Sequence, residues 1–139
     1  MPCVLIIDDN SSVLQALEFF FQSEGYAVLG APNGREGLRM AAENPVDIVL
    51  LDIEMPEMSG IAVCEAMKEN AALRHLPVVM MTGRPTRDLV TRALASGAAL
   101  VLGKPFDLGS LRKTFTELLG PAAVSPVVVP DDQYGHADN

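Results

Sequence analysis

The sequence predicts an α/β protein with an open, doubly wound sheet of five parallel strands. Five short apolar runs alternate along the chain with five segments of helical periodicity. Three of the runs are continuously apolar, which is typical of parallel strands whose two faces are both covered by helices. Strict alternation of strand and helix favours right-handed crossovers between parallel strands.

Each expected element is defined by an apolar run or by helical spacing. The expected strands are residues 4–7, 26–29, 48–51, 78–81 and 100–102. The first expected helix begins near Ser11 or Ser12 and ends before Gly25, and the others are residues 34–43, 59–69, 86–96 and 107–119.

Several helix ends carry recognisable signals. Ser12 and Gln15 have the spacing of a capping box at the start of the first helix. Gly25 is expected to end that helix in a left-handed conformation, and Gly97 to end the fourth. Asp107 is the expected cap of the fifth helix.

The periodic pattern stops after residue 119. We expect residues 1–120 to form one domain and residues 121–139, which contain three prolines, to be a disordered tail. The apolar run 127–129 leaves two interpretations open: it docks on a partner or a sheet edge, or it is a loose extension.

Composition excludes some classes of function. The net charge of −8 disfavours nucleic-acid binding, which needs a basic surface. No apolar run approaches the ~20 residues of a membrane span, and the N-terminus lacks the basic start of a signal peptide. Cys3 and Cys64 lack metal-ligand spacing, so we interpret both as reduced thiols of a cytoplasmic protein.

Residues that could take part in catalysis or ligand binding follow four of the five expected strands. In chain order they are Asp8, Asp9, Asp52, Thr82, Lys104 and Pro105. Ligands of doubly wound sheets bind beyond the carboxyl ends of the strands, so we expect these residues at one edge. Three carboxylates placed there resist ionising without a compensating cation. Oxygen ligands suit Mg²⁺, with Mn²⁺ as an alternative.

This set of groups is what an aspartyl phosphoryl transfer requires. Asp52 can attack phosphorus as a nucleophile, while a cation, the Lys104 ammonium and the Thr82 hydroxyl stabilise the phosphoryl oxygens. Each residue alone has a structural interpretation as well. Asp8 and Asp9 could cap the first helix, Thr82 could be a turn residue, and Lys104 could be solvated. Their joint occurrence after successive strands favours the phosphoryl site.

Four motifs resemble those of the receiver domain of bacterial two-component response regulators. They are VLIIDDN, DIVLLDIEMPEMSG, PVVMMTG and ASGAALVLGKPF, within a resemblance that covers about residues 2–119. The resemblance implies a flavodoxin-like (βα)5 fold with strand order 2-1-3-4-5. It also implies a stand-alone phosphoacceptor switch rather than an enzyme with a separate substrate.

The resemblance also implies roles for the carboxylates. Asp52 would accept a phosphoryl group from a histidine kinase or a phosphotransfer protein. Asp9, Asp52 and the backbone carbonyl of Glu54 would bind Mg²⁺ directly, and Asp8 would act mainly through water.

Further roles follow from the same resemblance, with one departure. Lys104 would pair with the phosphoryl group, Thr82 would move onto it as the switch, and the Lys104–Pro105 peptide bond would be cis. The family usually has an aromatic residue three positions before the lysine. Here that residue is Val101, so an aromatic flip is not available.

We expect phosphorylation to change affinity for an unidentified partner protein and to be lost slowly by self-dephosphorylation. The protein would be a monomer or a phosphorylation-dependent dimer, without nucleic acid or membrane as partner. An aspartate-dependent phosphatase would place a second Asp two residues after the first, but Asp8 is followed by Asp9 and Asn10. A flavin carrier would need a glycine- and hydroxyl-rich loop in place of DDNSS.

Two residues near the site have opposite charges. Glu54 lies two residues after Asp52, and Arg84 lies two residues after Thr82. One interpretation is an ion pair across the mouth of the site, through which Arg84 would control the lifetime of the phosphoryl group. The other is that both side chains point to solvent.

Overall fold

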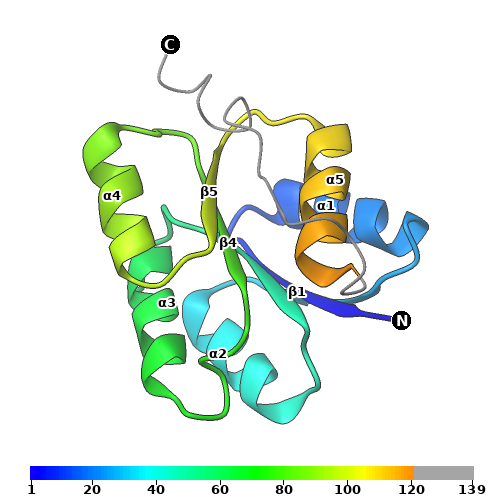
Figure 1. The fold of residues 1–139 in the computed structure, drawn as a ribbon, viewed down its shortest axis with the longest axis horizontal. Helices are drawn as coiled ribbons and strands as arrows, with labels where there is room; N and C mark the ends of the chain where they lie inside the picture. Colours follow the sequence, from blue (N-terminus) through cyan, green and yellow to red (C-terminus); the bar gives the residue numbers. More distant parts are fainter. Residues whose placement is uncertain (121–139) are drawn as a thin grey trace.

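The computed structural model describes residues 1–120. Its five parallel strands form one sheet in the order β2-β1-β3-β4-β5, which confirms the expected fold and strand order (Figure 1). The strands are β1 (Cys3–Ile7), β2 (Ala27–Ala31), β3 (Ile48–Asp52), β4 (Val78–Thr82) and β5 (Leu100–Gly103).

Five helices cover the two faces of the sheet. They are α1 (Ser11–Ser23), α2 (Gly34–Glu43), α3 (Gly60–Glu69), α4 (Arg87–Ala95) and α5 (Leu108–Leu119). Helices α1 and α5 pack on one face, and α2, α3 and α4 pack on the other (Figure 1). Among these helices, none is long and apolar enough to cross a membrane.

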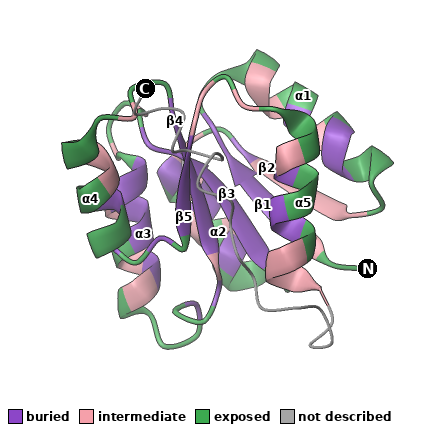
Figure 2. Cartoon of the chain, turned by 45° about the horizontal axis from the view of Figure 1, so that its top comes forward, coloured by how far each residue is buried: buried purple, intermediate pink, exposed green. Residues whose placement is uncertain are grey.

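The sheet separates two apolar cores. Leu51 and Met80 belong to the core beneath α2, α3 and α4, whereas Leu50 and Phe21 belong to the core beneath α1 and α5. Every residue of β3 and β4 is buried, as the purple strands of Figure 2 show. Because successive side chains of a strand face opposite cores, these central strands must be apolar at every position until they reach the edge.

Helix α1 begins at Ser11, as predicted, but its cap differs from the prediction. The N-cap is Asn10, and its side-chain oxygen accepts hydrogen bonds from the N–H groups of Ser12 and Val13 at 3.0 and 3.1 Å. The predicted capping box of Ser12 and Gln15 is therefore wrong. Asn10 lies one residue before the helix and already binds the free N–H groups of its first turn.

The other predicted helix signals are confirmed. Gly25 and Gly97 follow α1 and α4 with φ angles of +93° and +114°, which glycine adopts without steric strain. The side chain of Asp107 accepts a hydrogen bond from the N–H of Ser110 at 3.2 Å and caps α5.

Four of the five strands end later than predicted, whereas β1 ends at Ile7 as expected. Parallel pairing continues to Asp52 opposite Met81, and to Thr82 opposite Gly103, so β3, β4 and β5 each gain one residue. Strand β2 runs to Ala31 instead of residue 29. Asp52 and Thr82 are consequently the last residues of strands, held by the sheet itself. The predicted tail, with its apolar run 127–129, lies outside the part of the chain that the structure describes.

The chain turns back sharply after β3. The N–H of Gly60 donates to the carbonyl of Ile53 at 2.9 Å, and the N–H of Ile53 donates to the carbonyl of Met81 at 2.9 Å. A Cβ atom on residue 60 would overlap the carbonyl oxygen of Asp52 and lie 2.9 Å from the Cα of Ile53. The close approach of α3 to the end of β3 therefore requires glycine.

We expect Gly60→Ala to lower the free energy of unfolding by ~1–3 kcal/mol, because the added methyl meets only backbone that cannot move independently. Gly83→Ala is the matched control, since a Cβ there meets no atom within 4 Å. Urea denaturation of both variants measures the difference. Equal stability of Gly60→Ala and the parent would contradict the close approach.

Candidate functional site

Three carboxylates gather where β1 and β3 end. One oxygen from each of Asp8, Asp9 and Asp52 lies within 4.8 Å of the others. Asp8 and Asp52 are only 1% and 4% exposed, whereas Asp9 is exposed. The fold thus brings together the three carboxylates that the sequence places after the first and third strands.

A single ammonium group serves the two buried carboxylates. The Nζ of Lys104 lies 3.1 Å from Asp52 Oδ1 and 3.5 Å from Asp8 Oδ2. Burial alone would lower the pKa of Lys104, but the hydrogen bond and charge of Asp52, together with Asp8, raise it above its ordinary value. The ammonium therefore stays charged. The Lys104–Pro105 peptide bond is cis, as the resemblance implies.

Asp52 is an unusually weak acid for an aspartate. Burial raises the pKa of its carboxyl from 3.8 to about 6, against the hydrogen bond from Lys104, and the charge of Asp8 raises it further. One ammonium does not compensate two buried carboxylates and a third nearby. The site therefore lacks positive charge.

Asp8 organises the backbone that follows β1. Its Oδ1 accepts a hydrogen bond from the N–H of Asn10 at 2.9 Å. Because Asn10 caps α1, the first helix does not depend on Asp8 or Asp9 for its cap. Neither carboxylate therefore caps α1, which leaves a binding role as the other interpretation of both.

Thr82 and Glu54 form a hydrogen-bonded pair at the mouth of the site. The buried Thr82 hydroxyl donates to Glu54 Oε2 at 2.6 Å, and the N–H of Gly83 donates to Glu54 Oε1 at 3.2 Å. The Thr82 hydroxyl also accepts a hydrogen bond from the N–H of Arg84 at 2.9 Å. The carboxylate of Glu54 thus bridges the β3–α3 and β4–α4 loops.

The interpretation of Glu54 and Arg84 as an ion pair is wrong, and the alternative, that both side chains point to solvent, describes only Arg84. Within residues 1–120, no ion pair joins the two side chains, because the donors of Thr82 and Gly83 already hold the Glu54 carboxylate. Arg84 is exposed. From the sequence, Glu54 is expected to act only through its backbone carbonyl, as a metal ligand, and through its negative charge, as a partner of Arg84. The contact of Glu54 with Thr82 depends on the conformation of the β3–α3 loop, for which the sequence carries no direct signal.

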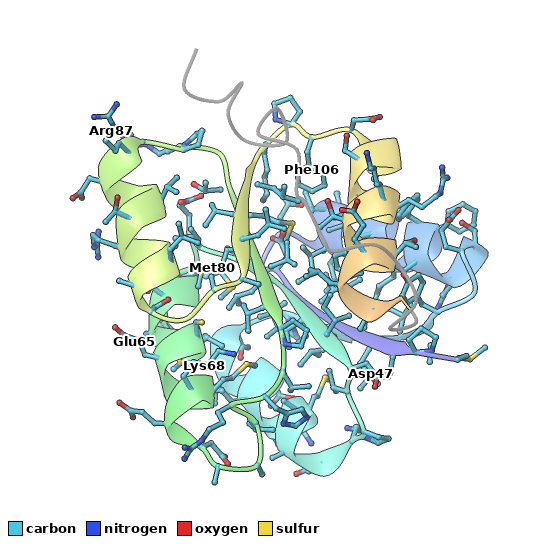
Figure 3. All side chains as sticks on the ribbon, in the orientation of Figure 1. Asp47, Glu65, Lys68, Met80, Arg87 and Phe106 are labelled. Atoms are coloured by element: carbon cyan, nitrogen blue, oxygen red, sulfur yellow. The ribbon has the colours of Figure 1, made fainter. Side chains whose placement is uncertain are left out.

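Val101 occupies the position that is usually aromatic in receiver domains. It is 1% exposed and lies opposite Met80 in the pairing of β4 with β5. Figure 3 shows Met80 on the side of the sheet covered by α3 and α4. A small buried side chain therefore fills this part of the core, and no ring is present there to change its orientation.

The donor set suits a divalent cation. All three side chains offer carboxylate oxygens, the ligands that Mg²⁺ prefers, and two of them are buried with a single ammonium between them. A cation would neutralise the carboxylate charge that, after burial, raises the pKa of Asp52.

The fold and the site define a doubly wound α/β domain with an acidic, lysine-containing site at the carboxyl edge of its sheet. The model of the response regulator receiver domain family matches residues 4–116, and the chain belongs to this family. We therefore interpret the site as that of a receiver domain of a two-component system.

Similar proteins differ in how much of their length this chain matches. It is 39% identical over 104 residues to the response regulator PleD of Caulobacter vibrioides, a match that covers 75% of this chain and 23% of PleD. It is 30% identical over 119 residues to the polar-differentiation response regulator DivK of Brucella anthropi, covering 86% of this chain and 97% of DivK. The structure of chemotaxis protein CheY4 of Vibrio cholerae superposes with a TM-score of 0.82 at 32% identity, covering 86% of this chain and 99% of CheY4.

We expect Asp52→Asn to stabilise the metal-free protein by about 1–3 kcal/mol near neutral pH. The native pKa of about 6 lies above the ordinary 3.8, so ionised Asp52 destabilises the native state. This penalty is fully present above about pH 6 and disappears toward pH 4, and the gain of the variant should disappear with it.

Urea denaturation in chelator at several pH values measures this gain. Asp88→Asn is the control, because Asp88 is exposed in the first turn of α4 and its neutralisation should lower stability by at most ~1 kcal/mol. A gain for Asp52→Asn that does not change with pH would contradict the raised pKa.

Proposed function

We propose that Asp52 is the phosphoacceptor of a two-component signalling switch. In this proposal a histidine kinase or phosphotransfer protein supplies the phosphoryl group, and the modified protein changes its affinity for a downstream partner. The family assignment supports the class of function. The two free cysteines, Cys3 and Cys64, favour the cytoplasm as its location.

The observation that carries the proposal is the position of Asp52 relative to Lys104. A nearly buried carboxylate ends a central strand and has an ammonium 3.1 Å from one oxygen. Such an ammonium can pair with phosphoryl oxygens whose charge develops during transfer. Because β3 and β5 fix both groups, little reorganisation is needed when the donor arrives.

The proposed transfer conserves atoms and charge. A carboxylate oxygen of Asp52 attacks phosphorus and forms an O–P bond, while the N–P bond of the donor phosphohistidine breaks and its imidazole keeps the electron pair. In self-dephosphorylation, water attacks phosphorus, the O–P bond breaks, and Asp52 returns to a carboxylate as inorganic phosphate leaves. The protein thus catalyses only its own modification.

A divalent cation belongs to this proposal. Asp9, Asp52 and the backbone carbonyl of Glu54 would hold Mg²⁺, or Mn²⁺, and Asp8 would act mainly through water. When bound, the cation neutralises charge on the phosphoryl oxygens. The gathering of the three carboxylates supports this ligand set.

We expect acetyl phosphate and Mg²⁺ to add the mass of one phosphoryl group to the parent, and peptide mapping to locate it on Asp52. The acetyl O–P bond breaks in this reaction and acetate leaves. Asp52→Asn should take up none, because an amide cannot form the acyl phosphate, while Asp88→Asn should label like the parent. Labelling of Asp52→Asn at the parental rate would refute the assignment.

We also expect Mg²⁺ to stabilise the parent against unfolding and to lose this effect in Asp9→Ala. At a concentration about ten times its dissociation constant, a ligand of the native state adds ~1.4 kcal/mol. Thermal denaturation with and without millimolar Mg²⁺ measures the effect. An unchanged midpoint in the parent would argue against the cation site, and an undiminished shift in Asp9→Ala against the role of Asp9.

A further inference from the structure

The side chain of Glu54 occupies two hydrogen-bond donors at the carboxyl end of β4. Its carboxylate accepts the Thr82 hydroxyl proton at 2.6 Å and the Gly83 N–H at 3.2 Å. Charged acceptors form stronger hydrogen bonds than neutral ones, and the Thr82 bond is short. The two loops at the mouth of the site are therefore held together by one carboxylate.

The hydroxyl of Thr82 has a single proton to donate. That proton is given to Glu54, and the oxygen already accepts from the N–H of Arg84 at 2.9 Å. The outer oxygens of a phosphoryl group on Asp52 can only accept hydrogen bonds. Thr82 therefore cannot bind such a group until it releases Glu54.

Electrostatic repulsion also favours the release of Thr82 from Glu54. A phosphoryl group brings a charge of about −2. Glu54 is close enough to Asp52 for its charge to contribute to the raised pKa of that residue, after burial and the charge of Asp8. A phosphoryl group on Asp52 would therefore repel the Glu54 carboxylate while competing for its donor.

We propose that Glu54 is a latch that holds Thr82 in the unphosphorylated conformation and must be displaced when Asp52 carries a phosphoryl group. This inference rests on the proposed function and deepens it. Glu54 acts through Thr82 and is thus a positioning residue. Its release separates the β3–α3 loop from the β4–α4 loop.

The β4–α4 loop connects the latch to a helix. Thr86 caps α4 by accepting a hydrogen bond from the N–H of Leu89 at 3.2 Å. Figure 3 shows Arg87, the first residue of α4, at the same end of the molecule as Phe106, which follows the lysine of the site. Opening the latch therefore frees the segment that leads from the site to α4.

A competing explanation needs a separate test. Removing any negative charge near Asp52 favours an anion there, with or without a bond to Thr82. Glu54→Gln removes the charge but keeps an oxygen that can accept the hydroxyl proton, whereas Glu54→Ala removes both. Glu57→Gln is the matched control, because Glu57 is an exposed residue of the same loop outside this hydrogen-bonded pair.

The experiment measures the affinity for beryllofluoride, a phosphoryl mimic, in the presence of Mg²⁺. We expect Glu54→Ala to bind about threefold to tenfold tighter than the parent, which corresponds to one net hydrogen bond. Glu54→Gln should tighten binding less, and Glu57→Gln should bind like the parent. In a Thr82→Ala background, the effect of Glu54→Ala should shrink to that of removing the charge alone and should equal the effect of Glu54→Gln.

Three results would overturn the latch. Glu54→Ala that binds beryllofluoride as tightly as the parent, or more weakly, would contradict the proposal. Equal effects of Glu54→Ala and Glu54→Gln, unchanged in the Thr82→Ala background, assign the effect to charge alone. A Gly83 amide resonance that is identical in the parent and Glu54→Ala shows that the carboxylate does not hold the loop.

Failure of the proposed function would look different. In that case the parent would bind no beryllofluoride and take up no phosphoryl group from acetyl phosphate. The Gly83 amide would still shift in Glu54→Ala and not in Glu57→Gln if the contact exists, because this measurement needs no phosphoryl chemistry. Absence of beryllofluoride binding in the parent would overturn the latch as a switch while leaving the contact established.

Discussion

The shortage of positive charge at the carboxyl edge of the sheet explains most of what is distinctive in this molecule. Asp8 and Asp52 are buried at the ends of β1 and β3, and the ammonium of Lys104, which follows β5, is shared between them. The ammonium can reach both carboxylates only if β1 and β3 are neighbours and β5 lies on the β3 side of β1. The strand order meets both conditions. Stability is thus given up at this edge, where the surplus negative charge is what the proposed cation would neutralise.

Much of the fold follows from the pattern of apolar residues. The continuous runs of β3 and β4 predict strands buried on both faces, and both strands are buried throughout. Alternation alone does not give the order of the strands, which came from the resemblance to receiver domains. The local signal for the cap of the first helix was less dependable. Both Asn10 and Ser12 are good caps by composition, and only the path of the chain after β1 determines which of them meets the free N–H groups.

The site was predictable where topology alone decides it. Residues at the ends of parallel strands meet at one edge, so Asp8, Asp52 and Lys104 could be grouped before any coordinates were known. The partner of Glu54 was not predictable in this way, because it depends on loop conformation. The β3–α3 loop contains a non-glycine residue, Glu57, with a φ of +69°, and the sequence gives no direct signal for that turn. Opposite charge favours Arg84 as the partner of Glu54, but in the folded chain Thr82 is the residue that forms the hydrogen bond.

A backbone hydrogen bond joins the residue after β5 to the end of β4. The N–H of Lys104 donates to the carbonyl of Thr82 at 2.7 Å. The residue whose side chain pairs with Asp52 is therefore attached, peptide to peptide, to the residue whose hydroxyl contacts Glu54. With Val101 in place of a movable ring, this hydrogen bond, which continues the pairing of β4 with β5, is a direct contact between the two ends of these strands at the site. A displacement of the end of β4 would therefore act on the backbone of Lys104, so in the proposed switch the detection of the phosphoryl group would be coupled to its retention.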